Sequence, residues 1–124
     1  MIMLDTHIAI ALFEGRNAGF SANTKRLLDR DTAFISPAVL FELEILHEIG
    51  RGRTRGVELT DYLTREFGIR IATDSFADVV AEALALAFTR DPFDRLIVAH
   101  AALLKVPLVT FDQQIRKHYP LAVI

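Results

Sequence analysis

Met1-Ile2-Met3-Leu4-Asp5-Thr6-His7 opens the chain and decides the fold that we predict for it. A run of four apolar residues ends in an acid, and apolar residues at helical spacing (Ile8, Leu12 and Phe13) follow at once. A short apolar run bounded in this way indicates a strand buried on both faces, as at the centre of a parallel sheet. Ligands of such sheets bind just beyond the carboxyl ends of the strands. Asp5 is therefore expected where this fold binds its ligand.

The composition restricts the class of protein. The chain has 124 residues, the size of one domain, and 52% of them are hydrophobic, so some apolar surface is expected to face a partner or a second copy. Cysteine is absent, which excludes disulfides and thiolate metal sites and favours hard ions such as Mg²⁺ or Mn²⁺. No signal peptide or membrane-spanning run is visible, so a cytoplasmic protein is expected. The net charge of −2 does not indicate general nucleic-acid binding.

Strands and helices are predicted to alternate along the chain. After the first strand, the expected helices cover residues 6–14, 22–28, 37–49, 57–67, 74–88, 92–104 and 113–118, and the later strands cover 34–36, 69–72, 107–110 and 121–124. Ser36-Pro37 and Asp91-Pro92 are strong helix starts, because each has a capping side chain followed by proline at the first helical position. This alternation indicates one α/β domain, residues 1–124, with helices on both faces of a parallel sheet.

Four acidic residues are predicted to meet at one edge of this sheet. Asp5 and Asp112 end strands there, and Asp94 lies in the first turn of a helix that starts there. Glu42 lies on the apolar stripe of its helix, and its side chain tilts back toward the same edge. Each acid also has a structural interpretation, as a helix cap or a partner of the helix dipole. Clustered carboxylates repel one another unless a cation or a proton relieves them, and Mg²⁺ is the natural cation.

The residues that surround these acids are familiar as a set. Four segments occur in this order: Leu4-Asp5-Thr6-His7, Ser36-Pro37-Ala38-Val39-Leu40-Phe41-Glu42, Asp91-Pro92-Phe93-Asp94-Arg95-Leu96-Ile97-Val98-Ala99-His100-Ala101 and Leu108-Val109-Thr110-Phe111-Asp112. The ordered set closely resembles the PIN-domain ribonucleases, in particular the VapC-type toxins of toxin–antitoxin pairs. The resemblance covers nearly the whole chain.

The resemblance implies a three-layer fold whose five parallel strands lie in the order 3-2-1-4-5. It also implies magnesium-dependent cleavage of RNA, with Asp5, Glu42, Asp94 and Asp112 as the catalytic acids. Of these, Asp5, Asp94 and Asp112 are the expected metal ligands. Thr6 and Thr110 match the polar residues beside the family's first and last acids, and we predict that they contact substrate. The implied partners are RNA, a cognate antitoxin protein and a second copy of the chain.

Several other residues carry weaker expectations. Arg95, beside Asp94, is a candidate for a phosphate contact, whereas Asp91 is expected to cap its helix. The four histidines lack metal-ligand spacing, so a zinc site is not expected, and His100 is expected to pack within its own helix. The helix predicted over residues 74–88 is apolar on nearly all sides, which indicates burial or contact with a second subunit.

Other functional classes fit the sequence less well. A phosphorylation-controlled receiver module has a similar length and an acidic pocket, but its adjacent acid pair after the first strand is missing here, as is its lysine at the end of the fifth strand. A haloacid-dehalogenase-like phosphatase would need a second aspartate where His7 stands. A catalytically inert PIN domain used only for binding remains an alternative, although all four acids are present.

Overall fold

The computed structural model describes residues 1–124 and has five strands and seven helices. The strands are β1 (Ile2–Leu4), β2 (Ala33–Ile35), β3 (Arg70–Ile71), β4 (Leu108–Val109) and β5 (Ala122–Val123). The helices are α1 (Thr6–Phe13), α2 (Ala22–Arg30), α3 (Pro37–Glu48), α4 (Gly56–Phe67), α5 (Phe76–Ala83), α6 (Pro92–Leu104) and α7 (Gln113–His118). The strands are two or three residues long; β2 has the predicted length but begins one residue earlier, and the other four are shorter than the sequence predicts.

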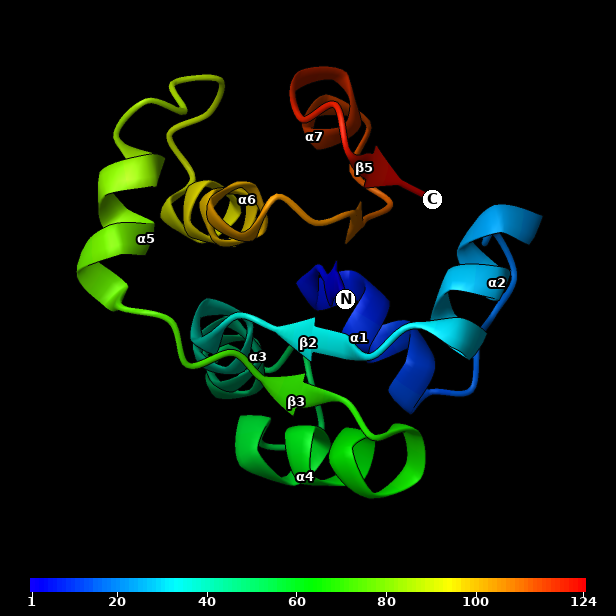
Figure 1. Ribbon diagram of the computed structural model, residues 1–124. Coiled ribbons are helices and arrows are strands. Elements are labelled where there is room, and N and C mark those ends of the chain that lie inside the picture. The colour runs from blue at the N-terminus through cyan, green and yellow to red at the C-terminus, as the bar shows by residue number, and fades with distance from the viewer.

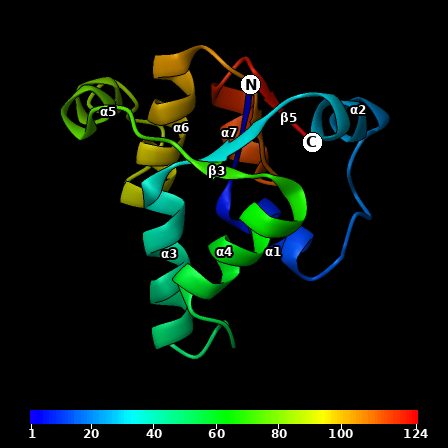
Figure 2. The same cartoon turned by 60° about the horizontal axis from the view of Figure 1, so that its bottom comes forward.

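All strand pairs are parallel, and the sheet order is β3-β2-β1-β4-β5, which confirms the predicted topology (Figure 1). The chain moves in one direction from β1 to β3 and in the opposite direction from β3 to β5. Right-handed crossovers therefore put the helices of the two halves on opposite faces of the sheet. In Figure 2, α1, α3 and α4 are gathered below β3, and α7 lies above it.

The first strand forms the centre of the core, as expected from its apolar run. Ile2, Met3 and Leu4 have no exposed surface, because β2 and β4 flank the strand and helices cover both faces. Met3 pairs with Leu108 and Leu4 pairs with Val109. This register brings the two residues that follow these pairs, Asp5 and Thr110, side by side at the carboxyl edge of the sheet.

Side-chain caps fix the helix starts at this edge. Ser36 caps α3 by accepting from the Ala38 N–H at 3.2 Å, and Pro37 follows at the first helical position. Asp91 caps α6 in the same way, accepting from two N–H groups of the first turn, with Pro92 next. Both helices start within a residue of the predicted position, because capping side chain and proline act together on the backbone.

One predicted helix is wrong in length. Residues 74–88 do not form a single helix: α5 covers only Phe76–Ala83, and Ser75 is its cap. The carbonyl of Ala83 accepts from the Arg95 guanidinium at 3.0 Å and from the Leu86 N–H at 3.1 Å, so a tertiary contact and a turn replace the next helical bond. The chain can then turn back to start α6. None of the helices combines the length and hydrophobicity needed to span a bilayer.

Candidate active site

The carboxyl edge of the sheet holds a cavity of about 330 Å³ that is lined mainly by acids. Its lining residues are Asp5, His7, Glu42, Asp91, Asp94, Phe111 and Asp112. They come from four separate parts of the chain: the end of β1, the middle of α3, the start of α6 and the loop after β4. The four acids predicted to be catalytic therefore do lie together, and Asp91 joins them.

Asp5 is the most buried of these acids, with 6% of its surface exposed. One carboxylate oxygen accepts from the Thr6 N–H at 2.8 Å, which caps α1, and the other accepts from the Thr110 hydroxyl at 2.6 Å. Burial raises the pKa of Asp5, and the two hydrogen bonds partly oppose that rise by favouring the carboxylate. The side chain is thus held rigidly at the junction of β1 and β4.

Glu42 reaches the cavity from the second turn of α3. Its carboxylate accepts a short hydrogen bond from the hydroxyl of Thr6, which joins the start of α1 to α3. Burial is the main cause that raises the pKa of Glu42, and the charge of Asp5 adds to it. Glu42 faces inward, as its place on the apolar stripe predicts, whereas Glu44 binds Arg55 and the Gly56 N–H on the outside.

Asp94 has the most perturbed acidity of the group. Burial first, and then repulsion from Asp91 and the three other acids, raises its pKa to about 7. Asp91 differs, because its Oδ1 accepts from the Phe93 N–H at 2.9 Å and from the Asp94 N–H at 3.1 Å. The two aspartates one turn apart therefore divide as the sequence predicts: Asp91 is the cap, and Asp94 is the third helical residue.

Asp112 and Thr110 complete the cavity from the end of β4. Asp112 caps α7 by accepting from the Ile115 N–H at 2.9 Å. The Thr110 hydroxyl accepts from the Asp112 N–H at 3.0 Å while it donates to Asp5. Thr110 consequently holds two of the acids in fixed relation to each other.

The cavity suits a hard metal ion in its chemistry but is not a preformed metal cage. Most of its donors are carboxylate oxygens, which are the ligand type that Mg²⁺ and Mn²⁺ prefer, and the imidazole of His7 is the one softer donor. No three acidic or histidine side chains in the chain converge closely enough to hold an ion as they stand. Mg²⁺ needs only one or two direct carboxylates, because it keeps several of its waters. The residues present therefore fit such an ion.

The residues predicted to contact substrate have other roles in the structure. Thr6 and Thr110 have no exposed surface, and their hydroxyls are bonded to carboxylates, so both position acids. Arg95 does not line the cavity, because its guanidinium bonds to the carbonyl of Ala83 on the side facing α5.

Sequence reasoning missed His7 and Phe111 as lining residues. Both stand beside residues that were singled out, His7 two positions after Asp5 and Phe111 between Thr110 and Asp112. His100, expected to pack within its own helix, instead connects three segments: its ring nitrogens lie 3.0 Å from Ser36 Oγ and 3.0 Å from Asp74 Oδ2.

Comparison with known proteins agrees with this geometry. The family model of the PIN domain matches residues 2–119. The chain belongs to the PIN domain family. No curated protein sequence matches this PIN domain significantly.

Solved structures resemble this PIN domain over its whole length. A toxin–antitoxin complex from Klebsiella pneumoniae is 22% identical, with a TM-score of 0.70, and covers 100% of this chain and 97% of that one. VapBC2 from Rickettsia felis, bound to a promoter DNA fragment, is 22% identical with a TM-score of 0.64, and the match covers 99% of this chain and 96% of that one. DNA-bound VapBC from Salmonella typhimurium is 20% identical with a TM-score of 0.60, and the match covers 99% of this chain and 95% of that one. At these identities the likeness shows the fold.

Proposed function

We propose that this PIN domain is a magnesium-dependent endoribonuclease and the VapC-type toxin of a type II toxin–antitoxin system. The observation that carries the proposal is the cavity into which four separate segments bring five carboxylates. Repulsion among carboxylates in such a cluster opposes folding unless a bound cation or a proton relieves it. The toxin–antitoxin complexes among the similar structures support the toxin assignment. In this proposal the protein acts on cytoplasmic RNA, as a homodimer, and a cognate antitoxin inhibits it.

Asp5, Asp94 and Asp112 are the proposed ligands of the ion, and Glu42 is the fourth catalytic acid. A bound Mg²⁺ would supply an activated water and would neutralise the charge that develops on the phosphodiester. Asp5 is held by Thr6 and Thr110, so its carboxylate needs little reorganisation to bind. Thr6 also orients Glu42 through its hydroxyl.

Asp94 is the group best suited to exchange a proton in the metal-free protein. Its pKa of about 7 means that both protonation states are populated near neutral pH. Binding of a cation would favour the carboxylate, because opposite charge stabilises the ionised form.

The test is incubation of the purified protein with mixed cellular RNA in Mg²⁺ and in excess chelator. We expect cleavage only with the metal. Asp5→Asn should remove cleavage while it keeps the fold, because the amide retains one acceptor oxygen but not the charge. Asp61→Asn, on the exposed side of α4, is the matched control for loss of one negative charge and should cleave normally.

Two results would contradict the proposal. Cleavage that persists in chelator, or that Asp5→Asn retains in full, would indicate a contaminating nuclease or another mechanism. An Asp5→Asn variant that unfolds in a much lower urea concentration and still cleaves RNA when folded would make Asp5 a structural cap alone.

A further inference from the structure

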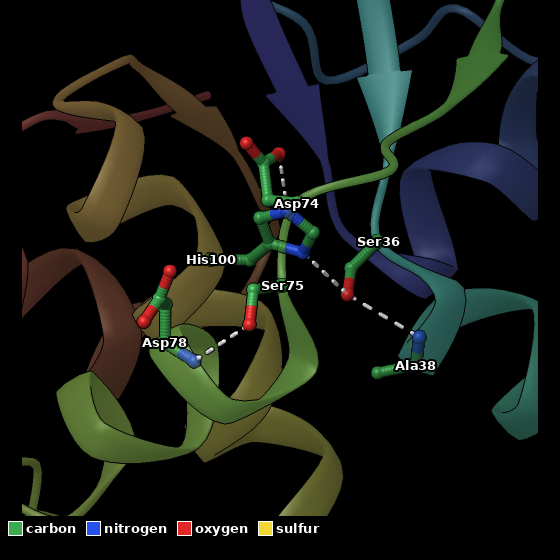
Figure 3. A network of polar contacts seen from close by, with 6 residues as sticks. All are labelled: Ser36, Ala38, Asp74, Ser75, Asp78 and His100. Atoms are coloured by element: carbon green, nitrogen blue, oxygen red, sulfur yellow. Dashed lines mark hydrogen bonds and ion pairs between the residues drawn. The ribbon is translucent and has the colours of Figure 1, made fainter.

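A buried hydrogen-bond network joins α6 to the start of α3 and to the segment just before α5. Its centre is His100, which is 1% exposed, and Figure 3 shows the ring between Ser36 and Asp74. Nδ1 of the ring lies 3.0 Å from Ser36 Oγ, and Nε2 lies 3.0 Å from Asp74 Oδ2. None of the three residues lines the acidic cavity at the carboxyl edge of the sheet. The cleavage proposed above therefore gives this network no role.

The hydrogens of the network have one arrangement that satisfies every group. Ser36 Oγ accepts from the Ala38 N–H at 3.2 Å, so the Ser36 hydroxyl is left to donate to Nδ1 of His100. Nε2 then carries the ring hydrogen and donates it to Asp74 Oδ2. Because Ser36 is only 2% exposed, water cannot replace His100 as the acceptor of its hydroxyl. Loss of the bond between α6 and the start of α3 would therefore leave a buried donor unpaired.

The helices α3 and α6 are joined at two points. One is the hydrogen bond between Ser36 and His100, and the other is the edge-to-face contact of Phe41 with Phe93, whose ring centroids are 5.7 Å apart. The later contact residue on α3 meets the earlier one on α6, so the helices run in opposite directions where they touch. Two points of contact restrain the angle between the helices as well as their distance. On each helix, the residue directly after the phenylalanine is an acid that lines the acidic cavity.

The position of Asp94 depends on α6 more than the other acids depend on their own helices. Hydrogen bonds hold the carboxylates of the other four acids, which are Asp5, Glu42, Asp91 and Asp112. The carboxylate of Asp94 accepts no hydrogen bond, so its place in the cavity is set by where α6 lies. Misplacement of a catalytic group by about 1 Å can lower a rate by about a hundredfold. Whatever fixes α6 against α3 is therefore expected to affect the chemistry.

We propose that His100 is a positioning residue of this nuclease. Its hydrogen bond to Ser36 holds α6 at the angle to α3 that places Asp94 with Glu42 in the acidic cavity. Asp74 fixes the ring in the tautomer that makes this bond. The inference rests on the proposed function. His100 touches neither the ion nor the RNA in it, and acts on the acids through the backbone of α6.

Two substitutions of similar size separate the hydrogen bonds of His100 from its bulk. His100→Gln keeps an acceptor for Ser36 and a donor for Asp74, whereas His100→Leu fills the space and keeps neither. Leu63→Ala is the control for lost stability, because Leu63 is fully buried on α4 and lies outside the acidic cavity. Urea melts establish the conditions in which each variant is folded, and the other measurements are made there.

The first readout is the binding of Mn²⁺ without RNA, followed by electron paramagnetic resonance. We expect His100→Leu to bind Mn²⁺ about tenfold more weakly than the parent, the lower end of what loss of an outer partner of a metal ligand costs. His100→Gln and Leu63→Ala should bind Mn²⁺ like the parent. The second readout is cleavage in Mg²⁺, in which His100→Leu should lower kcat about tenfold and leave KM unchanged, because His100 does not contact RNA.

Asp74→Ala tests the network from its outer end and carries the test if His100→Leu does not fold. The Asp74 side chain is 35% exposed, so its removal opens no buried cavity. Without it the ring of His100 is free to take the other tautomer, and the Ser36 hydroxyl then loses its acceptor. We expect the affinity for Mn²⁺ to fall below that of Asp78→Ala, the matched control at an exposed position in the first turn of α5.

The outcomes separate this inference from the proposed function. If the parent binds Mn²⁺ and cleaves RNA, and folded His100→Leu matches it in both, the positioning role is wrong and the nuclease stands. The role is also wrong if Leu63→Ala loses as much as His100→Leu, or if His100→Gln recovers nothing. If the parent itself neither binds Mn²⁺ nor cleaves RNA, the proposed function fails, and the role of His100 fails with it.

Discussion

Three of the acids that line the cavity also cap helices. Asp5, Asp91 and Asp112 each cap a helix with a side-chain oxygen and also line the acidic cavity. The structural and functional interpretations of these residues are therefore compatible, because a helix start at the carboxyl edge of a parallel sheet needs a cap at the place where ligands bind. Glu42 and Asp94 have no capping role, and burial with charge repulsion raises the pKa of both.

The division between Asp91 and Asp94 can be tested by substitution. Asp91→Ala removes the two hydrogen bonds that start α6 and should lower the free energy of unfolding by about 1 kcal/mol, as lost caps do. It should keep much of its cleavage activity. Asp94→Ala should lose metal-dependent cleavage with little loss of stability. A urea melt and one cleavage assay of each variant are sufficient, and a stable, inactive Asp91→Ala beside an active Asp94→Ala would reverse the two roles.

The raised pKa of Asp94 predicts a pH dependence of stability in the absence of metal. Between about pH 4 and pH 7 the native state holds a proton on Asp94 that the unfolded chain has lost, so the free energy of unfolding falls as pH rises through this range. In chelator, Asp94→Asn should flatten this fall and should be more stable than the parent at pH 8. Urea melts from pH 4 to pH 8 measure it, with Asp61→Asn as the control. If the free energy of unfolding of Asp94→Asn falls as steeply with pH as that of the parent, Asp94 is not the group with the raised pKa.

At the scale of single residues, the sequence predicted the positions of the acids better than the contacts of the residues beside them. The acids are marked by their place at strand ends and helix starts, which local patterns reveal. The directions of Arg95 and His100 depend on α5, which the sequence places only loosely, so the bonds to Ala83 and Asp74 could not be foreseen.

At the scale of elements, the predicted helices are right where a local signal fixes each end. Ser36-Pro37, Asp91-Pro92 and Gly68, which is left-handed with φ +67°, mark boundaries within a residue or two. The region after α5 has no capping residue, proline or glycine that marks a helix end, and the apolar residues 84–88 continue the sequence pattern of a helix. Tertiary contacts decide its path instead, and no single-sequence pattern contains them.

The network around His100 ties the segment just before α5 to α3 and α6, and the hydrogen bond from Arg95 to Ala83 holds the other end of α5. Alanine in place of His100 leaves the Ser36 hydroxyl without an acceptor and the Asp74 carboxylate without its donor and opens a cavity, so we expect the free energy of unfolding to fall by about 2–4 kcal/mol. Hydrogen exchange should rise more in α5 than in β1. His118→Ala, at the exposed end of α7, is the control and should change stability little. Equal exchange in α5 with and without His100 would show that the His100 network does not hold α5.

At the scale of the whole molecule, the sheet order followed from resemblance rather than from any pattern in the residues. Periodicity indicated a parallel α/β sheet, and the ordered motifs supplied the arrangement 3-2-1-4-5 that the structure has. The apolar excess foreseen from composition lies on the surface in the form of large exposed residues, which include Phe41, Ile49, Val57, Phe67, Phe76 and Leu84.

A separate groove lies between α1, α3 and α4, and this groove is where we expect the antitoxin to bind. It has a volume of about 390 Å³, and Ile10, Phe13 and Leu46 line it together with Arg51 and Arg53. Arg55 is already paired with Glu44, so the other two arginines carry the charge available to a partner. An acidic, amphipathic segment would satisfy both the apolar wall and these arginines.

We therefore expect a small protein encoded by the neighbouring gene to copurify with the chain when the two are expressed together. Alone, the chain should self-associate in light scattering, because the apolar surface then has no cover. Arg53→Glu should reduce capture of the partner, whereas Arg65→Glu, on the exposed side of α4, should capture it normally and controls for the charge change. RNA cleavage by free Arg53→Glu should be unchanged, because Arg53 lies outside the acidic cavity. A clean monomer that captures nothing would remove the basis for an antitoxin and leave the nuclease proposal to stand on the acidic cavity alone.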